Sequence, residues 1–148
     1  MTIEAAIAEV LAGDQGVQAL ASGRVYQLKF PQVPEYPAGR VQLIDEPLAY
    51  DLSGPTGLIQ SLVQVDAAAY EADGDDPYAA ATALGKAIDE ALSGQAHTVS
   101  AGSPAVSPPE DGIFISAAFR ESRRVDYDPD ELRIVVCQQD YRVWWRFN

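Results

Sequence analysis

The sequence predicts an α+β fold, in which a small antiparallel β-sheet carries helices packed on one face. Two observations support this class. Most expected strands follow one another through short turns, which favours antiparallel pairing. The regular alternation of strands and helices that a doubly wound α/β sheet requires is absent. With 148 residues, the chain is expected to form one domain, residues 1–148.

The first half of the chain is expected to contain two helices and three strands. Apolar residues recur at helical spacing over residues 3–12, and Gly13 is expected to end that helix. A second short helical turn is expected between Val17 and Ala21. The connections between the strands are the proline-rich residues 31–37 and the turn-rich residues 51–57, a hairpin tip. The three strands are expected at residues 24–30, 40–49 and 58–69.

A third helix and two long strands complete the expected order of elements. Asp76 can cap the helix, Pro77 suits its first position, and Gly94 suits its end. Residues 94–112 are rich in Ser, Pro and Gly, and they are expected to form a long surface loop. The last two strands are expected at residues 113–125 and 132–147.

The last strand has large side chains on both of its faces. Alternation places Tyr141, Val143, Trp145 and Phe147 on one face, and Arg142, Trp144 and Arg146 on the other. The first face can pack on the helices. The second face, to which we also assign Val135 and Cys137, would be wet in a two-layer monomer. Two explanations stay open: the loop at residues 94–112 shields this face, or a neighbouring subunit buries it, since interfaces favour Trp and Arg.

Few residues support catalysis or metal binding. His97 and Cys137 are the sole histidine and cysteine, so a Cys–His pair could only join these two. A cysteine in an apolar strand is a poor nucleophile because burial raises its pKa. Asp73, Asp75 and Asp76 resemble the start of a calcium loop, but no bidentate Glu follows at the required spacing. We therefore expect no enzyme activity, no catalytic residue, no metal and no cofactor.

The net charge of −12 is unevenly distributed. Residues 1–111 hold 16 acids and four bases, whereas residues 112–148 hold six of each. A chain this acidic should not bind nucleic acid tightly, because binding needs Lys and Arg to displace phosphate counterions. Solubility is the simplest reason for such a charge.

The sequence also bears on the compartment. No apolar run approaches the roughly 20 residues that span a bilayer, so no membrane association is expected. The first ten residues carry Glu4 and Glu9 and no base, unlike a signal peptide. A single cysteine allows no internal disulfide and suits a reducing cytoplasm.

Several segments occur in a characteristic order. These are GRVY at residues 23–26, a proline-rich stretch at 30–37, YDLSGP at 50–55 followed by LVQVD at 62–66, ALSG at 91–94 and DYRVWWR at 140–146. This order resembles the tail-completion family of long-tailed bacteriophages, also called tail-terminator or head–tail joining proteins. The resemblance covers nearly the whole chain, although residues 95–111 are longer and richer in Ser and Pro than the family leads us to expect.

The resemblance implies a tail-terminator-like fold and a structural role in the virion. Such subunits have a small antiparallel sheet flanked by helices, and they typically form a hexameric ring on the last ring of the tail tube. The implied partners are copies of the chain itself, the tail tube protein and a head–neck or connector protein. The ring ends tube growth and lets DNA pass through without specific binding. Gene transfer particles use similar parts, so the expected location is the tail end or neck of a particle assembled in the host cytoplasm.

Two groups of residues are expected at the subunit or tube interface. One is the projecting turn with Tyr50, Leu52, Gly54 and Pro55, and the other is the last strand with Arg142, Trp144 and Arg146. A ring needs two different complementary patches on each subunit, which these groups could supply. We also hypothesise that many of the acids line the channel, where phosphate would find nothing to bind.

Three other classes of function stay open. The protein could be another neck component, such as a stopper or connector adaptor, which its position in the particle would reveal. It could be an acidic inhibitor that mimics DNA, in which case a monomer or dimer in solution is expected. An enzyme is the third alternative, and it would depend on His97 and Cys137.

Overall fold

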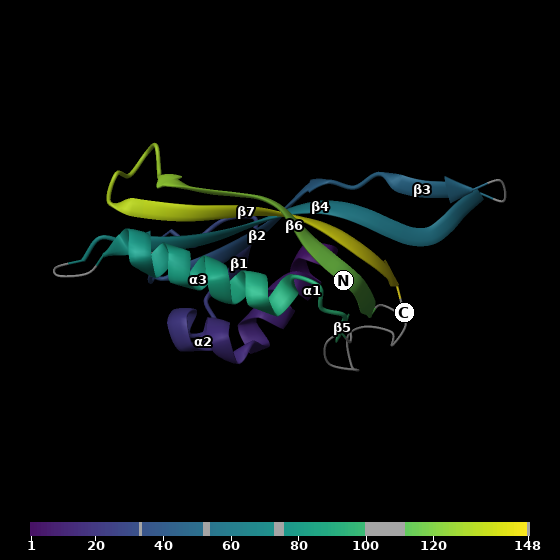
Figure 1. Ribbon diagram of the computed structural model, residues 1–148, viewed down its shortest axis with the longest axis horizontal. Helices are drawn as coiled ribbons and strands as arrows, with labels where there is room; N and C mark the ends of the chain where they lie inside the picture. Colours follow the sequence, from purple (N-terminus) through teal and green to yellow (C-terminus); the bar gives the residue numbers. More distant parts are fainter. Residues whose placement is uncertain (33, 52–53, 73–75, 100–111, 148) are drawn as a thin grey trace.

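The computed structural model describes residues 1–32, 34–51, 54–72, 76–99 and 112–147. Three helices and seven strands lie in these residues (Figure 1). In chain order they are α1 (Ile3–Gly13), α2 (Gln15–Ala21), β1 (Val25–Gln27), β2 (Ala38–Asp45), β3 (Leu48–Asp51), β4 (Gly54–Tyr70), α3 (Pro77–Leu92), β5 (His97–Val99), β6 (Ile113–Tyr127) and β7 (Ile134–Phe147).

The strands form one mixed sheet in the order β1-β2-β4-β7-β6-β5, and β3 pairs with β4 beside β2. Every pair is antiparallel except β1 with β2, which is parallel. The prediction of a purely antiparallel sheet is therefore wrong at one edge. The reason is the connection between β1 and β2: a parallel pair needs a crossover rather than a tight hairpin. Residues 28–37 supply this crossover.

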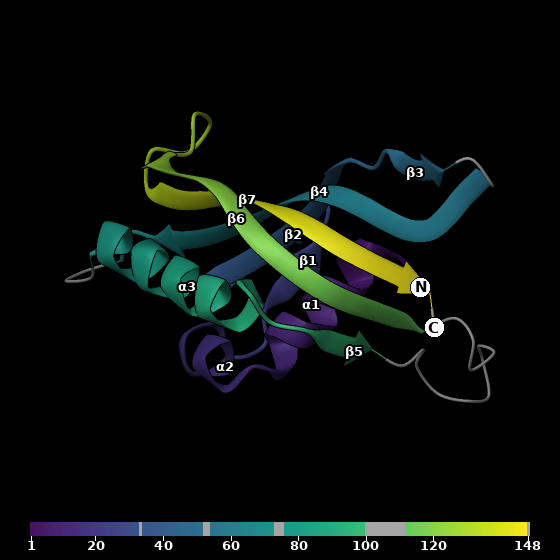
Figure 2. The ribbon, with the colours of Figure 1, turned by 45° about the vertical axis from the view of Figure 1, so that its right-hand side comes forward.

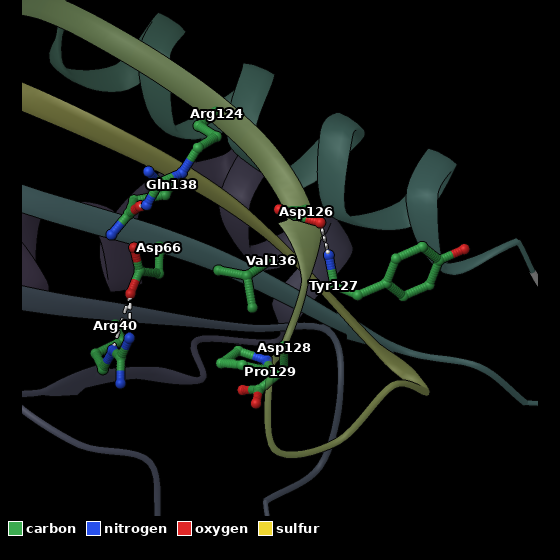
Figure 3. A pocket seen from close by; sticks show the side chains of 9 residues that line it. All are labelled: Arg40, Asp66, Arg124, Asp126, Tyr127, Asp128, Pro129, Val136 and Gln138. Atoms are coloured by element: carbon green, nitrogen blue, oxygen red, sulfur yellow. Dashed lines mark hydrogen bonds and ion pairs between the residues drawn. The ribbon is translucent and has the colours of Figure 1, made fainter.

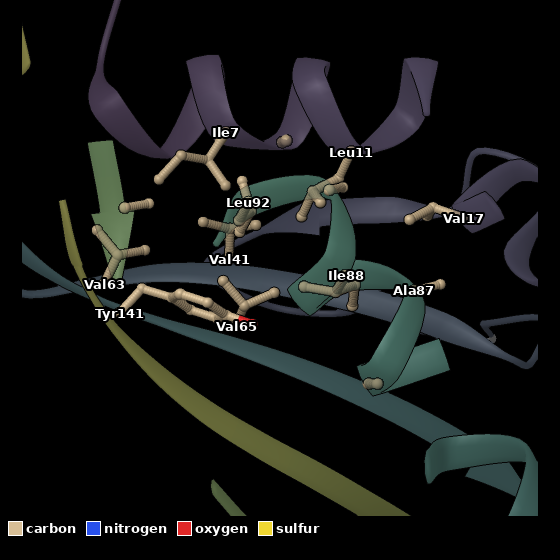
Figure 4. Close-up of a cluster of buried hydrophobic side chains, with 14 of the residues drawn as sticks. Ile7, Leu11, Val17, Val41, Val63, Val65, Ala87, Ile88, Leu92 and Tyr141 are labelled. Carbon is tan, nitrogen blue, oxygen red and sulfur yellow. The ribbon is translucent and has the colours of Figure 1, made fainter. Parts of the chain in front are cut away.

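The helices cover one face of the sheet, as predicted, and leave the other face open (Figures 1 and 2). Apolar side chains of α1 and α3 meet those of the central strands in one continuous core. Figure 4 shows part of this core, with Ile7 and Leu11 from α1, Ile88 and Leu92 from α3, and Val41, Val63, Val65 and Tyr141 from the sheet. Burying each such side chain contributes about 1.5–3 kcal/mol.

The helix ends follow from local hydrogen bonding. The side chain of Asp76 accepts hydrogen bonds from the amides of Tyr78 and Ala79, and Pro77 occupies the first position of α3, as predicted. The hydroxyl of Thr2 accepts from the Ala5 amide at 3.2 Å and starts α1. These caps satisfy amides that would otherwise have no partner within the helix.

Helix α3 approaches β7 closely at Gly85. A Cβ atom added to Gly85 would lie 2.6 Å from the Cys137 sulfur, so only glycine allows this approach. The buried Gln139 amide donates to the Gly85 carbonyl at 2.8 Å and fixes the helix along the strand. The phenol of Tyr141 bonds Asp89 at 3.1 Å, one turn further along α3.

Two predicted strands differ from the observed ones. The strand expected at residues 24–30 is limited to β1, because Leu28 adopts a left-handed φ of 67°. The strand expected at residues 40–49 is two strands, β2 and β3, which are interrupted at Glu46 and Pro47. Pro47 has no amide hydrogen for a sheet ladder, and the register against β4 already shifts between Leu43 and Asp45.

Two connections also differ. The hairpin tip expected at residues 51–57 is tighter, since β4 begins at Gly54, which pairs with Asp51. The loop expected at residues 94–112 contains β5 at its start, where His97–Val99 pairs with β6. The remainder of that loop, residues 100–111, lies outside the described residues.

Candidate assembly surfaces

The open face of the sheet is the one that the helices leave uncovered, and β7 crosses its centre. Residues 134–145 of β7 pair with β4 without a register shift, so strict alternation decides the face of each side chain. Val136, Gln138, Asp140, Arg142 and Trp144 are half-buried on the open face, whereas their odd-numbered neighbours are buried towards the helices.

The assignment of Val135 and Cys137 to the open face is wrong. Their relative exposures are 1% and 0%, and both belong to the helix-covered core. They share the parity of Tyr141, so counting back from that residue in steps of two would have placed them correctly. The expected shielding loop falls mainly on residues 100–111, outside the described part of the chain, so both explanations for the open face stay predictions.

Arg142 and Trp144 lie in what we call the open-face patch, formed with Leu62, Ala117 and Phe119. Arg142 makes a bidentate ion pair with Glu121, with distances of 2.8 and 3.2 Å from its Nε and Nη2 atoms. This hydrogen bonding raises the pKa of the Arg142 guanidinium. Trp144 is half-buried between Gln60 of β4 and Ala117 of β6. The patch thus combines an aromatic ring with a rigidly held cation.

Arg146 lies at the exposed end of β7. Its guanidinium stands 5.4 Å from the centroid of the Phe114 ring, in a cation–π contact with the neighbouring strand. Phe147 beside it is 54% exposed. This end of the strand therefore has apolar and cationic groups that face solvent.

The β3–β4 hairpin extends past the rest of the sheet, and we call it the arm (Figure 2). Its backbone pairs Tyr50 with Pro55 and Asp51 with Gly54. Tyr50, Gly54 and Pro55 are therefore on the arm as expected, although their side chains lie outside the description, and Leu52 lies entirely outside the described residues.

The structure does not bring the two predicted groups into one patch. Trp145 of β7 pairs with Ile59 of β4, and Gly54 lies five residues further along β4. At the strand rise of about 3.4 Å per residue, the arm ends roughly 17 Å beyond that pair. The arm and the open-face patch are two separate surfaces.

A polar cluster at the centre of the open face was not anticipated from the sequence. Asp66 is fully buried, yet its carboxylate accepts hydrogen bonds from Arg40 and from the side-chain amide of Gln64 at 3.0 Å. Arg124 donates to Gln138 on the adjacent strands. No sequence signal links Arg40 to Asp66, because 26 residues and a strand pairing separate them.

A hollow of about 380 Å³ lies over this cluster, between the sheet and the β6–β7 turn (Figure 3). It is lined by Arg40, Asp66, Arg124, Asp126, Tyr127, Asp128, Pro129, Val136 and Gln138. Figure 3 shows Arg40 and Asp66 pointing toward each other from adjacent strands. The buried carboxylate of Asp66 already has hydrogen-bond partners within the subunit. We therefore interpret the ion pair beneath this hollow as structural rather than reactive.

The aromatic rings of Phe30 and Tyr36 hold the described part of the β1–β2 crossover against the sheet next to this hollow. Tyr26, Phe30, Tyr36 and Tyr70 follow one another with ring centroids 6.0–6.2 Å apart. Arg40 stands 5.2 Å from the Phe30 ring centroid. Burial, followed by the nearby charges of Asp128 and Glu131, raises the pKa of the Tyr36 phenol. The β6–β7 turn therefore lies close to the crossover loop.

The two candidate catalytic residues do not meet. Nε2 of His97 is 2.9 Å from the Ala91 carbonyl oxygen, and His97 pairs with Ile115, which in turn pairs with Trp145. Cys137 lies eight residues before Trp145 on β7, a rise of roughly 26 Å. Burial also raises the pKa of the Cys137 thiol, which lowers its reactivity.

The acidic segment before α3 is only partly described. Asp76 uses its carboxylate to cap the helix, while Asp73 and Asp75 lie outside the described residues. Within the described ranges, no group of three or more His, Cys, Asp or Glu side chains could hold a metal ion. None of the described helices is long and apolar enough to cross a membrane.

Comparisons with known proteins give a likeness of fold. No family model matches the chain, and no curated protein matches it. A solved structure described as the virion of a native gene transfer agent (GTA) particle contains a chain of similar fold, with a TM-score of 0.61 and 19% sequence identity. The likeness covers 97% of this chain and 94% of the other. At this identity it shows the fold alone: this chain has the fold of a chain from a gene transfer agent virion.

Proposed function

We propose that this chain is a structural virion protein that forms a ring on the head-proximal end of a phage or gene transfer particle tail. The ring ends growth of the tail tube, joins the tail to the head–neck and lets DNA pass. The observation that carries this proposal is the likeness to a GTA virion chain, which spans nearly the full length of both chains. Because the likeness spans both chains rather than a shared fragment, it favours a similar role for the two proteins.

The two surfaces on the subunit suit a ring. A ring with rotational symmetry needs one patch that meets a different patch on the next copy. The arm projects beyond the subunit and can reach a neighbour or the tube, and the open-face patch has Trp144 and Arg142, the residue types that dominate interface energies. Arg146 extends the patch towards the end of β7.

The proposal includes no catalysis and no cofactor. Cys137 is buried beneath α3, and His97 lies far along the sheet from it. Such a subunit acts through its shape and its contacts with neighbouring proteins, which stop the tail tube from growing further. The net charge of −12 fits a conduit that does not bind DNA, because few cations are available to displace phosphate counterions.

Deletion of the gene in a particle-producing strain tests this function. Tails that are overlong, or tails not joined to heads, are expected in electron micrographs, and immunogold against the protein should mark the head-proximal tail end in wild-type particles. Label elsewhere in the neck would favour a stopper or adaptor. Tails of normal length and attachment in the deletion strain would overturn the proposal, and a monomeric protein absent from particles would favour the acidic inhibitor.

A further inference from the structure

The sheet has a free strand edge on each side. On one side, β2 pairs with β1 only as far as Val41, and residues 42–45 have no described strand beyond them. On the other side, β5 covers β6 only at residues 113–115, and the last described backbone partner is the Gly94 amide, which donates to the Ala118 carbonyl at 2.9 Å. Residues 119–127 of β6 are therefore a second open edge. Free edges of this kind can pair with another strand.

The two free edges lie at the same level of the sheet. One row of paired residues runs from Gln42 through Gln64 and Asp140 to Ser122. The next row runs from Leu43 through Val63 and Tyr141 to Arg120. Only β4 and β7 separate the edges. Arg123 and Arg124 share the rows of Val41 and Arg40, which β1 covers, so they come opposite the free end of the next β2 when that copy is displaced by about four residues along the strands.

The strand directions also agree. The pairs β2–β4, β4–β7 and β7–β6 are all antiparallel, so β2 and β6 run in opposite directions. A head-to-tail repeat of subunits would therefore set β6 of one copy antiparallel to β2 of the next. The alternation within each subunit would continue unbroken across the contact.

The edges carry opposite charges. Asp45 and the adjoining Glu46 end the β2 edge, while Arg123 and Arg124 lie in the middle of the β6 edge, between Glu121 and Asp126. The three arginines and two acids of residues 119–127 leave the β6 edge with a net positive charge. Within the described part of the chain, none of the side chains of Asp45, Glu46, Arg123 and Arg124 belongs to a salt bridge. Opposite charges on two surfaces steer their association and fix which edge meets which.

Both edges also expose large apolar side chains. Ile44 on β2 is 49% exposed and Phe119 on β6 is 53% exposed. Contact between copies along these edges would remove part of this apolar surface from water.

We propose that copies of this chain join edge to edge. The stretch of β6 around Arg123 and Arg124 in one subunit pairs with the free end of β2 in the next, displaced by about four residues from equal height, so that the two arginines lie beside Asp45 and Glu46. This inference rests on the proposed ring and names the contact that closes it. The contact is heterologous, as a ring requires. A continuous sheet of repeating strands would then run from subunit to subunit.

Charge exchange between the edges tests the contact in particles. The acidic-edge variant is Asp45→Lys with Glu46→Lys, and the basic-edge variant is Arg123→Glu with Arg124→Glu. Each variant alone would bring like charges together, so its copy number in purified particles should fall on the order of ten-fold or more. A chain with all four substitutions should be incorporated again. Co-expression of the two single-edge variants should also restore incorporation, because each mutated edge then meets a complementary one.

The matched control is Lys29→Glu with Lys86→Glu, which changes the net charge as much as the basic-edge variant does but lies on neither edge. Circular dichroism and thermal melting establish that every variant folds. Glu46 accepts a hydrogen bond from Ser61 at 2.8 Å, so Asp45→Lys and Arg124→Glu serve as milder single substitutions if the double variant unfolds.

The outcomes separate the edge contact from the function. If both single-edge variants are incorporated into particles as well as wild type, the proposed edge contact is wrong. The charges would then serve only to prevent unwanted strand pairing at the edges of the subunit. Loss that the four-fold variant and the co-expression both fail to repair, with folding intact, also overturns it. If wild-type protein is found at the tail end and the variants are incorporated equally well, the edge contact alone is refuted. If wild-type protein is absent from particles, the ring itself is refuted.

Discussion

Substitution of Gly85 tests the packing that sets the helix layer on the sheet. In Gly85→Ala, the new Cβ would stand 2.6 Å from the Cys137 sulfur and 3.4 Å from the Gln139 amide nitrogen. The first distance is shorter than a van der Waals contact, so α3, β7 or the Cys137 side chain must shift. Overpacking of this kind costs about 1–3 kcal/mol.

Two further terms modify this cost. Alanine in a helix is favoured over glycine by up to about 1 kcal/mol. A shift of α3 also strains the buried hydrogen bond from Gln139 to the Gly85 carbonyl, which contributes about 0.5–1.5 kcal/mol. These two terms largely cancel, so the expected net destabilisation is about 1–3 kcal/mol. In a domain of this size it lowers the melting temperature by about 2–4 °C per kcal/mol.

A double-mutant cycle identifies the cause. Cys137→Ala removes the sulfur that the new methyl group would meet, so adding Gly85→Ala to it should cost at least about 1 kcal/mol less than in wild type. Gly13→Ala is the control, because nothing lies within 4 Å of its added Cβ and it ends α1. Urea denaturation followed by circular dichroism gives all four free energies. A Gly85→Ala protein as stable as wild type, or additive effects in the cycle, would refute this packing.

The remaining predictions concern buried polar groups. Ser61→Ala should cost about 1–3 kcal/mol in urea unfolding, since the buried Trp145 indole donates to this hydroxyl at 2.8 Å and would lose its acceptor; an unchanged midpoint would contradict this. Arg40→Ala should cost about 3–5 kcal/mol because it leaves the Asp66 carboxylate buried without its cation. The control Lys86→Ala breaks an ion pair with Glu90 in which both side chains are exposed, and it should cost less than about 1 kcal/mol. Stability should fall as the pH rises above about 9, because burial raises the pKa values of Cys137 and Tyr141 in the folded state, so their deprotonation favours unfolding. Unfolding at several pH values checks this, and Tyr141→Phe with Cys137→Ala should flatten the alkaline decline. Thiol reagents at neutral pH should modify Cys137 only on unfolding, and labelling at the rate of a free thiol would show that the α3–β7 contact opens.

Local signals account for the elements that the sequence predicts correctly. Asp76, Pro77 and the apolar spacing that follows define α3 within a few residues, because capping and helical period are properties of neighbouring residues. The long final strands follow in the same way from alternation. The mixed α+β class then results from the order of these elements.

Features that depend on pairing between residues far apart in the sequence could not be predicted from these local signals. The short strand β5 has little pattern of its own and exists because it lies beside β6. The parallel β1–β2 pair depends on where residues 28–37 carry the chain, and the Arg40–Asp66 pair exists only once β2 and β4 are in register. The interruption at Pro47 is different, since proline at that position was a local warning against one continuous strand.

The sequence predicted the face of β7 on which the candidate interface residues lie, but it did not predict how far they lie from the arm. Arg142, Trp144 and Arg146 do occupy the open side of β7. Their distance from the arm could not be estimated, because it depends on the length of β4 beyond its pairing with β7. The free edges of β2 and β6 require the strand order, which no single segment encodes.

Cryo-microscopy of purified particles tests the central claim most directly. The account predicts density for this fold as a closed ring between the last tail-tube ring and the head–neck, with a central channel and the β2 and β6 edges of adjacent copies in contact. A particle whose tail end lacks this fold, or holds it as isolated copies away from the channel, would contradict the account.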